Sequence, residues 1–326
     1  MAAERFDVVV VGAGISGIGA GVHLQDKSPD RSFVILEGRP DIGGTWDLFK
    51  YPGIRSDSDM HTLGYEFKPW TAEKSIADGP SIMQYLRETV AEHDLRRHMR
   101  FGERVVRADW STPNATWTVH TKRADGSTGM FECNYLFMCA GYYSYKAGYL
   151  PEFPGREKFC GTIVHPQEWP EDLEYANKRV VVIGSGATAV TIVPAVAQSA
   201  AHVTMLQRSP TYMVSRPDRD ALANFLRKVL PDQVAYNITR AKNTWRQQLV
   251  YKRTRTKPDE IKMLLLGGIQ LELGGKYPIK KHFFPRYNPW DQRLCLVPNS
   301  DFFAAMRSGR ASVDRKSTRL NSSHRT

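Results

Sequence analysis

Apolar and polar positions along this chain form short continuous apolar runs separated by amphipathic stretches, a pattern typical of an α/β protein. Residues 6–11 and 32–37 are apolar runs of strand length, and the segment between them predicts a helix through about Gln25. Residues 178–208 repeat the order of strand, helix and strand. The repetition predicts two Rossmann-like units, each built around a parallel sheet.

Other segments have different periods. The spacing over 81–93 predicts an amphipathic helix, and the alternation over 101–138 predicts short antiparallel strands. Residues 135–139 form an apolar run that predicts another buried strand. Residues 218–275 have a helical, basic pattern that does not fit a doubly wound sheet, and 294–313 return to strand, helix and the start of a strand.

These patterns divide the chain into two nucleotide-binding domains and an insertion. The last thirteen residues are polar, rich in Ser and Arg, and without hydrophobic period; they resemble translated adapter or vector sequence. The expected parts are a first domain (1–150), a linker with the second domain (151–217), a helical insertion (218–285), a return to the second domain (286–313) and the non-native-looking tail (314–326).

The composition is that of an ordinary globular protein, with 41% hydrophobic and 24% charged residues. Four scattered cysteines without a C-x-x-C pair indicate neither a disulfide framework nor a zinc or other metal site, and they favour a reducing cytoplasm. The polar start leads directly into a strand, which predicts no signal peptide. Residues 180–201 are uncharged and long enough for a membrane span, but a buried parallel strand over 180–183, a glycine turn and a covered helix account for them better.

The net charge of +11 is concentrated rather than spread. Residues 219–257 contain ten Lys and Arg against two Asp. No nucleic-acid-binding motif accompanies them, so a solvated basic helical surface is the preferred interpretation. Attraction to an anionic cofactor or peripheral contact with an anionic membrane are the alternatives.

The first glycine-rich turn, Gly12-Ala-Gly14-Ile-Ser16-Gly17, follows a strand and opens a helix. Its glycines permit the tight turn, the approach of a pyrophosphate and the close packing of helix on strand. Glu37 ends the next strand, where a carboxylate accepts hydrogen bonds from ribose hydroxyls. Because an acidic residue disfavours a 2′-phosphate, this turn predicts FAD or NAD.

The second turn, Gly184-Ser-Gly186-Ala-Thr-Ala189, has Ala in place of the third Gly. The strand after it ends at Arg208, and an arginine at this place favours a 2′-phosphate. The turn therefore predicts NADPH, with a solvent-exposed Arg208 of no function as the alternative. FAD in the first domain and NADPH in the second predict a flavoprotein that accepts hydride from NADPH.

Two longer motifs indicate the chemistry that comes after the hydride transfer. The first is Phe159-x-Gly161-x-x-x-His165-x-x-x-Trp169-Pro170; the second is Gly44-Thr-Trp46, Tyr51-Pro-Gly53 and Asp57. In both motifs the chain resembles the type I Baeyer–Villiger monooxygenases, most closely the ethionamide-activating branch. The resemblance extends over about residues 5–313. The resemblance implies an FAD- and NADPH-dependent enzyme that inserts one oxygen atom of O₂ into ketones, giving esters or lactones, or adds it to sulfur, through a flavin C4a-peroxide.

The resemblance also assigns roles to residues. It implies that Arg293 is the cation that stabilises the anionic oxidant, and that Asp57 beside the flavin orients this arginine. Judged without the family, Asp57 is a turn-capping acid and Arg293 a surface arginine. His165 matches a linker residue that couples the nucleotide domains.

The same resemblance extends the cofactor sites. The residues expected to bind FAD are Gly12, Gly14, Ser16, Gly17, Glu37, Thr45, Trp46, Asp47, Leu48, Asp57 and the backbone of Val105. Those expected to bind NADPH are Arg55 and Ser56 at the nicotinamide end, with Gly184, Ser185, Gly186, Ala187, Thr188, Ala189, Val190, Arg208 and Ser209.

Beyond Val313 the resemblance ends, whereas the family continues with further sheet strands and the rest of the FAD domain. We therefore expect the 326-residue chain to be poorly soluble and weak or inactive as an enzyme. The alternatives to oxygenation are an NADPH-binding flavoprotein fragment or an NADPH oxidase. A disulfide reductase would need a redox cysteine pair, which the sequence lacks. Small ketones or sulfides and O₂ are the expected partners.

Overall fold

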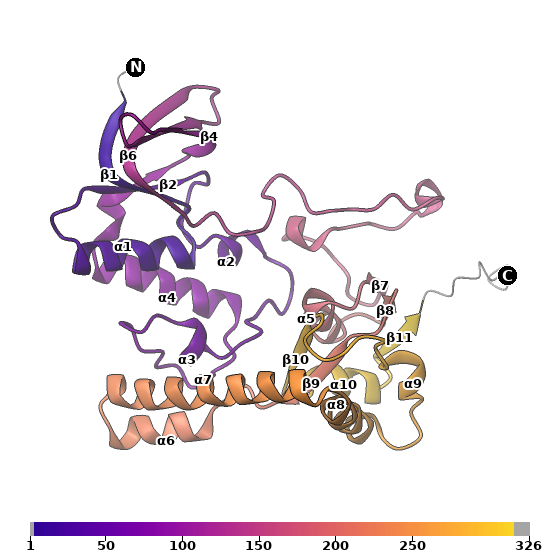
Figure 1. The fold of residues 1–326 in the computed structure, drawn as a ribbon. Coiled ribbons are helices and arrows are strands. Elements are labelled where there is room, and N and C mark those ends of the chain that lie inside the picture. The colour runs from indigo at the N-terminus through magenta and orange to yellow at the C-terminus, as the bar shows by residue number, and fades with distance from the viewer. Residues whose placement is uncertain (1–2, 316–326) are drawn as a thin grey trace. The chain divides into compact units, whose positions relative to one another are not determined.

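The computed structural model describes residues 3–315, which form two compact units (Figure 1). Within the described residues, unit 1 comprises 3–50 and Gly79–Trp169, and unit 2 comprises Tyr51–Asp78 and 170–315. The sequence assigned residues 51–78 to the first domain, but their contacts group them with unit 2. In the described part of the chain, no helix has the length and apolar character required to cross a membrane.

Unit 1 contains a six-stranded sheet in the order β3-β2-β1-β6-β5-β4. The first four strands in this order are parallel and the last two add to them in antiparallel fashion. The strands are β1 (Glu4–Val11), β2 (Phe33–Glu37), β3 (Met99–Phe101), β4 (Arg104–Ser111), β5 (Thr116–Lys122) and β6 (Thr128–Met138). The helices are α1 (Ile15–Lys27), α2 (Thr45–Leu48), α4 (Gly79–Glu92), η1 (Leu95–His98), η2 (Arg156–Lys158) and η3 (Pro166–Glu168).

Unit 2 contains a parallel three-stranded sheet, β11-β8-β7, and a separate parallel pair, β10-β9. The strands are β7 (Arg179–Ile183), β8 (His202–Gln207), β9 (Tyr212–Arg216), β10 (Leu294–Pro298) and β11 (Ala311–Arg315). The helices are α3 (Met60–Leu63), α5 (Ala187–Val196), α6 (Ala221–Val229), α7 (Asp232–Thr256), α8 (Pro258–Leu273), α9 (Ile279–His282) and α10 (Asp301–Arg307). The insertion expected to be helical thus forms α6 to α9.

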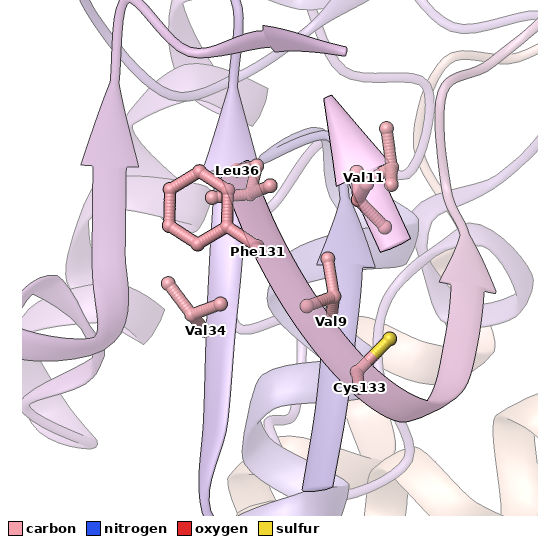
Figure 2. Close-up of a cluster of buried hydrophobic side chains, with 7 residues drawn as sticks. Val9, Val11, Val34, Leu36, Phe131 and Cys133 are labelled. Carbon is pink, nitrogen blue, oxygen red and sulfur yellow. The ribbon is translucent and has the colours of Figure 1, made fainter. Parts of the chain in front are cut away.

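A hydrophobic core lies on one face of the unit 1 sheet (Figure 2). Side chains from four strands meet there. The run of valines in β1, a central strand with a parallel neighbour on each side, is buried, as is typical of a parallel sheet whose two faces are covered. The buried members are Val9, Val11, Val34, Leu36, Val119, Phe131 and Cys133. This core packs against the carboxyl ends of β1 and β2. The first glycine turn follows β1, and Glu37 is the last residue of β2.

Two strands expected to be buried are partly exposed. In β7 the side chains of Val181 and Ile183 are 57% and 61% exposed, and in β6 Tyr135 and Met138 are also exposed. Within residues 3–315, β7 pairs only with β8. At the chain end, β11 continues to Arg315 and so includes Asp314, the first residue of the tail expected to be foreign; residues 316–326 lie outside the described residues.

We expect Phe131→Ala to lower the free energy of unfolding of unit 1 by about 3–5 kcal/mol, because the ring is 2% exposed and its removal leaves a cavity. Phe137→Ala, on the same strand but 39% exposed, is the control and should change it by less than about 1 kcal/mol. Urea unfolding followed by circular dichroism measures both. Equal losses would contradict the placement of the core.

Candidate active site

The first glycine turn is sterically fixed in unit 1. Gly12 has φ +104°, and a Cβ there would lie 2.6 Å from the carbonyl oxygen of Cys139. A Cβ on Gly17 would lie 1.8 Å from the carbonyl oxygen of Gly12. Gly14 precedes α1 and lies against Gly44. The turn therefore leads the backbone into a helix N-terminus, the arrangement that accepts a phosphate in dinucleotide folds.

Glu37 is buried at the end of β2 and faces this turn. One carboxylate oxygen accepts a hydrogen bond from the Ala13 N–H at 2.7 Å, and the other accepts one from the Arg39 N–H at 2.9 Å. Each carboxylate oxygen can accept two hydrogen bonds, so both retain capacity for ribose hydroxyls. The position and the remaining acceptors are compatible with the predicted role.

Arg39 holds the loop between Glu37 and α2, although no sequence pattern marked it. Its guanidinium pairs with Asp47 at 2.6 Å and donates to the Gly44 carbonyl at 3.1 Å, while the Tyr145 ring lies 5.7 Å from its Cζ. Asp47, predicted to lie along a cofactor, is therefore already engaged in an ion pair. Thr45, Trp46 and Leu48 share the short helix α2 with it.

Val105 belongs to a segment that runs beside the end of β2. The Glu103 N–H donates to the Glu37 carbonyl at 2.9 Å, and a Cβ on Gly38 would lie 3.4 Å from the Arg104 Cα. Residues 103–105 thus run next to the carboxylate expected to bind ribose. The first candidate dinucleotide site is assembled within unit 1 from segments far apart in the sequence.

The motif that begins at Phe159 lies at the end of unit 1, up to Trp169. The His165 Nδ1 accepts a hydrogen bond from the Gln167 N–H at 3.2 Å, and the Gln167 side chain donates to the Ser144 carbonyl at 2.6 Å. A Cβ on Gly148 would overlap the His165 ring, at 1.8 Å from Cε1. His165 therefore packs against the segment that follows β6, at Gly148.

The second glycine turn lies in unit 2 between β7 and α5. Gly184 has φ +134°, and its N–H donates to the Leu206 carbonyl at 2.8 Å. The Ser185 hydroxyl donates to the Ser209 carbonyl at 2.8 Å, which joins the turn to the loop after β8. Arg208 between them is exposed and makes no ion pair within residues 3–315. Its guanidinium is available to an anionic ligand beside the turn. The rest of the motif, from Ala187 to Val190, forms the first turn of α5.

Residues 51–57 belong to unit 2 and pack against its helix α5. Gly53 has φ +78°, and a Cβ there would lie 2.8 Å from the Ala195 Cβ on α5. The Tyr51 hydroxyl is hydrogen-bonded to the Thr188 side chain, and burial raises the pKa of Tyr51. Ser56 is buried and forms two hydrogen bonds with Ala77. The Ser56 N–H donates to the Ala77 carbonyl at 2.8 Å, and the Ser56 hydroxyl accepts from the Ala77 N–H at 3.2 Å.

Two ion pairs complete the attachment of this segment. Arg55 pairs with Asp301, the first residue of α10, through both terminal guanidinium nitrogens, Nη1 and Nη2. Arg293, immediately before β10, pairs with Asp57. The two residues that the family resemblance implies for catalysis are thus in direct contact, although 236 positions separate them. Asp301 was not found from the sequence, because nothing near it indicates which arginine it meets.

The Asp57–Arg293 pair is accessible. The arginine side chain is 53% exposed and the carboxylate 32% exposed. An arginine remains protonated at all physiological pH values, and one carboxylate uses only part of its donor set. The guanidinium can therefore hold a second anionic or polar oxygen while Asp57 fixes its direction.

The four cysteines form no disulfide in the described part of the chain. All four are free, and Cys133 and Cys295 are buried. Burial raises the pKa of Cys295 to about 11, so this thiol is protonated at neutral pH.

Fold and site together define an α/β protein with two dinucleotide turns and an arginine–carboxylate pair attached to the second. The sequence model of the family described as flavin-binding monooxygenase-like matches residues 74–262, and that of the NAD(P)-binding Rossmann-like domain matches residues 10–72. The chain belongs to the flavin-binding monooxygenase-like family.

Curated relatives agree with this assignment. The FAD-containing monooxygenase EthA of Mycobacterium tuberculosis (strain ATCC 25618 / H37Rv) is 55% identical over 311 residues, which cover 95% of this chain and 63% of EthA. The probable FAD-binding monooxygenase AlmA of Acinetobacter baylyi is 49% identical, with 95% of this chain and 62% of AlmA covered. The chain thus spans less than two thirds of the length of these relatives.

Solved structures share the fold. An oxidized steroid monooxygenase bound to NADP superposes with a TM-score of 0.77 at 23% identity, covering 95% of this chain and 65% of that one. Cyclohexanone monooxygenase from Rhodococcus sp. Phi1 bound to NADP⁺ superposes with a TM-score of 0.72 at 22% identity, covering 96% and 65%. The predicted fold class, two Rossmann-like domains with a helical insertion, is confirmed.

Gly17→Ala should destabilise unit 1 by about 1–3 kcal/mol, because the added methyl meets the Gly12 carbonyl. Gly186→Ala, at the N-cap of α5 in the second glycine turn, has φ −78° and no atom within 4 Å of the added Cβ, and should change stability by less than about 0.5 kcal/mol. Thermal unfolding compares the two variants. A Gly17→Ala protein as stable as the Gly186→Ala protein would contradict the close packing.

Proposed function

We propose that this chain carries the two nucleotide sites and the catalytic arginine of an FAD- and NADPH-dependent monooxygenase of Baeyer–Villiger type. In the proposed reaction a ketone, O₂, NADPH and a proton give an ester or lactone, NADP⁺ and water. The observation that carries the proposal is the Asp57–Arg293 pair, held in the same unit as the second glycine turn. The curated relatives are named as FAD-containing or FAD-binding monooxygenases.

FAD is assigned to the first site. The Gly12–Gly17 turn and the N-terminus of α1 would hold its pyrophosphate, and the remaining acceptor capacity of Glu37 would hold its ribose. Ser16 lies in the first turn of α1, and the backbone at Val105 lies next to the end of β2. Bound flavin supplies the capacity to take hydride and to activate O₂.

NADPH is assigned to the second site. The Gly184–Ala189 turn would hold its pyrophosphate, and Arg208, exposed and without an ion pair among residues 3–315, would hold its 2′-phosphate. Arg55 and Ser56 would meet its nicotinamide end. The segment 51–57 is attached to α5 through Gly53, so these residues are positioned with the turn that would bind the pyrophosphate.

Arg293 would act on charge that develops on oxygen. Its guanidinium is permanently positive, half-exposed and directed by the Asp57 carboxylate. A fixed cation lowers the energy of an anionic oxygen and of a tetrahedral adduct at a carbonyl without having to reorganise. Asp57 would keep that cation in one orientation, since removing it leaves a flexible side chain in solvent.

The substrate is proposed only by class, as a carbonyl compound or a sulfide. Among the structural neighbours, one cyclohexanone monooxygenase contains cyclohexanone, which indicates the chemistry that the shared fold can accommodate. The free cysteines favour a cytoplasmic site of action. The alternative, NADPH oxidation without oxygenation, shares the nucleotide sites and would yield hydrogen peroxide without ester.

Arg208→Ala should weaken NADPH binding by roughly tenfold or more while leaving NADH binding nearly unchanged, because only NADPH loses a charge-assisted contact. Isothermal titration of the purified chain with each nucleotide measures the two affinities. The exposed Arg310 is the control: Arg310→Ala should change neither affinity. An equal effect of Arg208→Ala on both nucleotides would remove the phosphate-binding role.

Arg293→Ala should retain FAD and NADPH binding and lose ester formation by roughly a hundredfold or more, as expected for a residue that stabilises developing charge. Since the chain spans 63% of EthA, activity is measured in a hybrid that continues this chain with the C-terminal remainder of the M. tuberculosis protein. Ester is quantified by gas chromatography, and nucleotide binding by titration.

The control is Arg253→Ala, which removes an arginine of the same 53% exposure from an ion pair with Glu260 on the helical insertion. This variant should keep full activity. Normal ester formation by Arg293→Ala would show that the stabilising cation is another residue, and hydrogen peroxide without ester in the parent hybrid would favour the oxidase.

A further inference from the structure

Helices α6 and α7 of unit 2 lie side by side (Figure 1), and each carries exposed large apolar side chains. Seven large apolar residues on them are between 44% and 66% exposed. We call this set the hairpin face: Leu222, Phe225, Val229, Val234, Ile238, Trp245 and Leu249. Such a set on the surface of one supersecondary element requires an explanation, because single exposed apolar residues are common but grouped ones mark contact surfaces.

The spacing shows that each helix presents one stripe. On α6 the residues succeed one another at intervals of three and four, and on α7 at intervals of four, seven and four. At about 100° per residue these positions share one side of the helix. The buried residues Tyr236 and Asn243 lie on the opposite side of α7. The apolar stripe of α7 therefore lies on the side of the helix away from these buried residues.

The opposite side of α7 is hydrogen-bonded to residues 59–65 within unit 2. Asn243 donates to Asp59 at 3.0 Å, and the Tyr236 hydroxyl donates to the Tyr65 carbonyl at 3.0 Å. Arg240 donates to three carbonyls around α3, those of His61, Thr62 and Gly64. Since α7 is anchored through this polar side, the hairpin face is left for something outside the unit.

Cations border the hairpin face. Residues 221–256 contain eight Lys and Arg and one Asp. Lys228, Arg246 and Lys252 make no ion pair within the described residues. Lys252 comes three positions after Leu249 and so shares its side of α7, while Arg246 and Lys228 adjoin Trp245 and Val229 in the sequence.

We propose that the hairpin face binds the surface of a bilayer that contains anionic phospholipids. Aromatic and aliphatic side chains would enter the boundary between headgroups and acyl chains, and the long side chains of Lys228, Arg246 and Lys252 would reach the phosphates. The charge complementarity selects this occupant. A second copy of the chain joined through the same face would bring the same cations together, and the net charge of +11 opposes that association.

The test is flotation of the purified 326-residue chain with vesicles of phosphatidylcholine alone or of phosphatidylcholine and phosphatidylglycerol in equal parts. The protein should float with the anionic vesicles and much less with the neutral ones. Added salt should reduce the bound fraction, because it screens exposed charges. Absence of binding to anionic vesicles at low salt would overturn the proposal.

Substitutions distinguish vesicle binding through the hairpin face from non-specific adsorption of exposed apolar side chains. Phe225→Ser with Trp245→Ser should lower partitioning roughly tenfold or more, and both residues are exposed, so the fold is expected to persist, as circular dichroism would verify. Lys228→Gln with Lys252→Gln should reduce the preference for anionic vesicles. Val181→Ser with Ile183→Ser, which removes similarly exposed apolar side chains from β7, is the matched control and should leave binding unchanged.

Each other outcome counts against the proposal. If the β7 variant loses as much binding as the hairpin variant, the attraction is non-specific. If the hairpin variant binds vesicles normally, the lipid contact lies elsewhere. If the hairpin variant instead changes the oligomeric state in light scattering while vesicles are not bound, the face joins two copies of the chain.

Discussion

The close packing of residues 51–57 on α5 is the constraint on which the rest of the candidate site depends. Gly53 can approach Ala195 only because it has no Cβ and adopts φ +78°. This approach brings Asp57 to Arg293 and Arg55 to Asp301, pairs that join the loop to two other segments of unit 2. A bulky residue at position 53 would separate both carboxylate–guanidinium pairs together, although neither contains that residue. The Asp57–Arg293 contact is thus a consequence of backbone proximity rather than of the attraction between two exposed charges, which alone contributes little.

The two glycine turns have similar sequences but different steric requirements. In unit 1, β1 has neighbours on both sides, and the carbonyl of Cys139 at the end of β6 closes the space beside Gly12. In unit 2, β7 pairs only with β8 among residues 3–315, and a Cβ at Gly184 meets no atom within 4 Å. The positive φ of Gly184 still requires glycine there. The second turn is therefore defined by backbone conformation, and the first by conformation and packing together.

These differences explain which features could be predicted from the sequence. Strand, turn and helix in each Rossmann unit depend on local patterns, so β1 to β2 and β7 to β8 were predicted closely. Burial of β6 and β7 was predicted wrongly, because an apolar run does not reveal which segments cover a strand. The contacts of Arg39 with Asp47 and of Arg55 with Asp301 had no local signal, since each depends on how distant segments meet. The Asp57–Arg293 contact was anticipated only through family resemblance, and the sequence alone favoured ordinary surface roles for both residues.

The roles of the basic residues in the insertion can likewise be separated only with the structure. As a sequence, residues 219–257 favoured a solvated basic helical surface, with contact to an anionic cofactor or an anionic membrane as the alternatives. In the fold their cations serve different purposes: Arg240 satisfies carbonyls around α3, and Lys242 pairs with Asp220 at 2.7 Å. Lys228, Arg246 and Lys252 have no such partner in the described part of the chain and adjoin the exposed apolar residues of α6 and α7. A charge that is merely solubilising needs no apolar neighbours, whereas a charge that meets lipid phosphates does. The division of α7 into a polar anchored side and an apolar outward side is therefore what distinguishes a contact surface from a solvated helix.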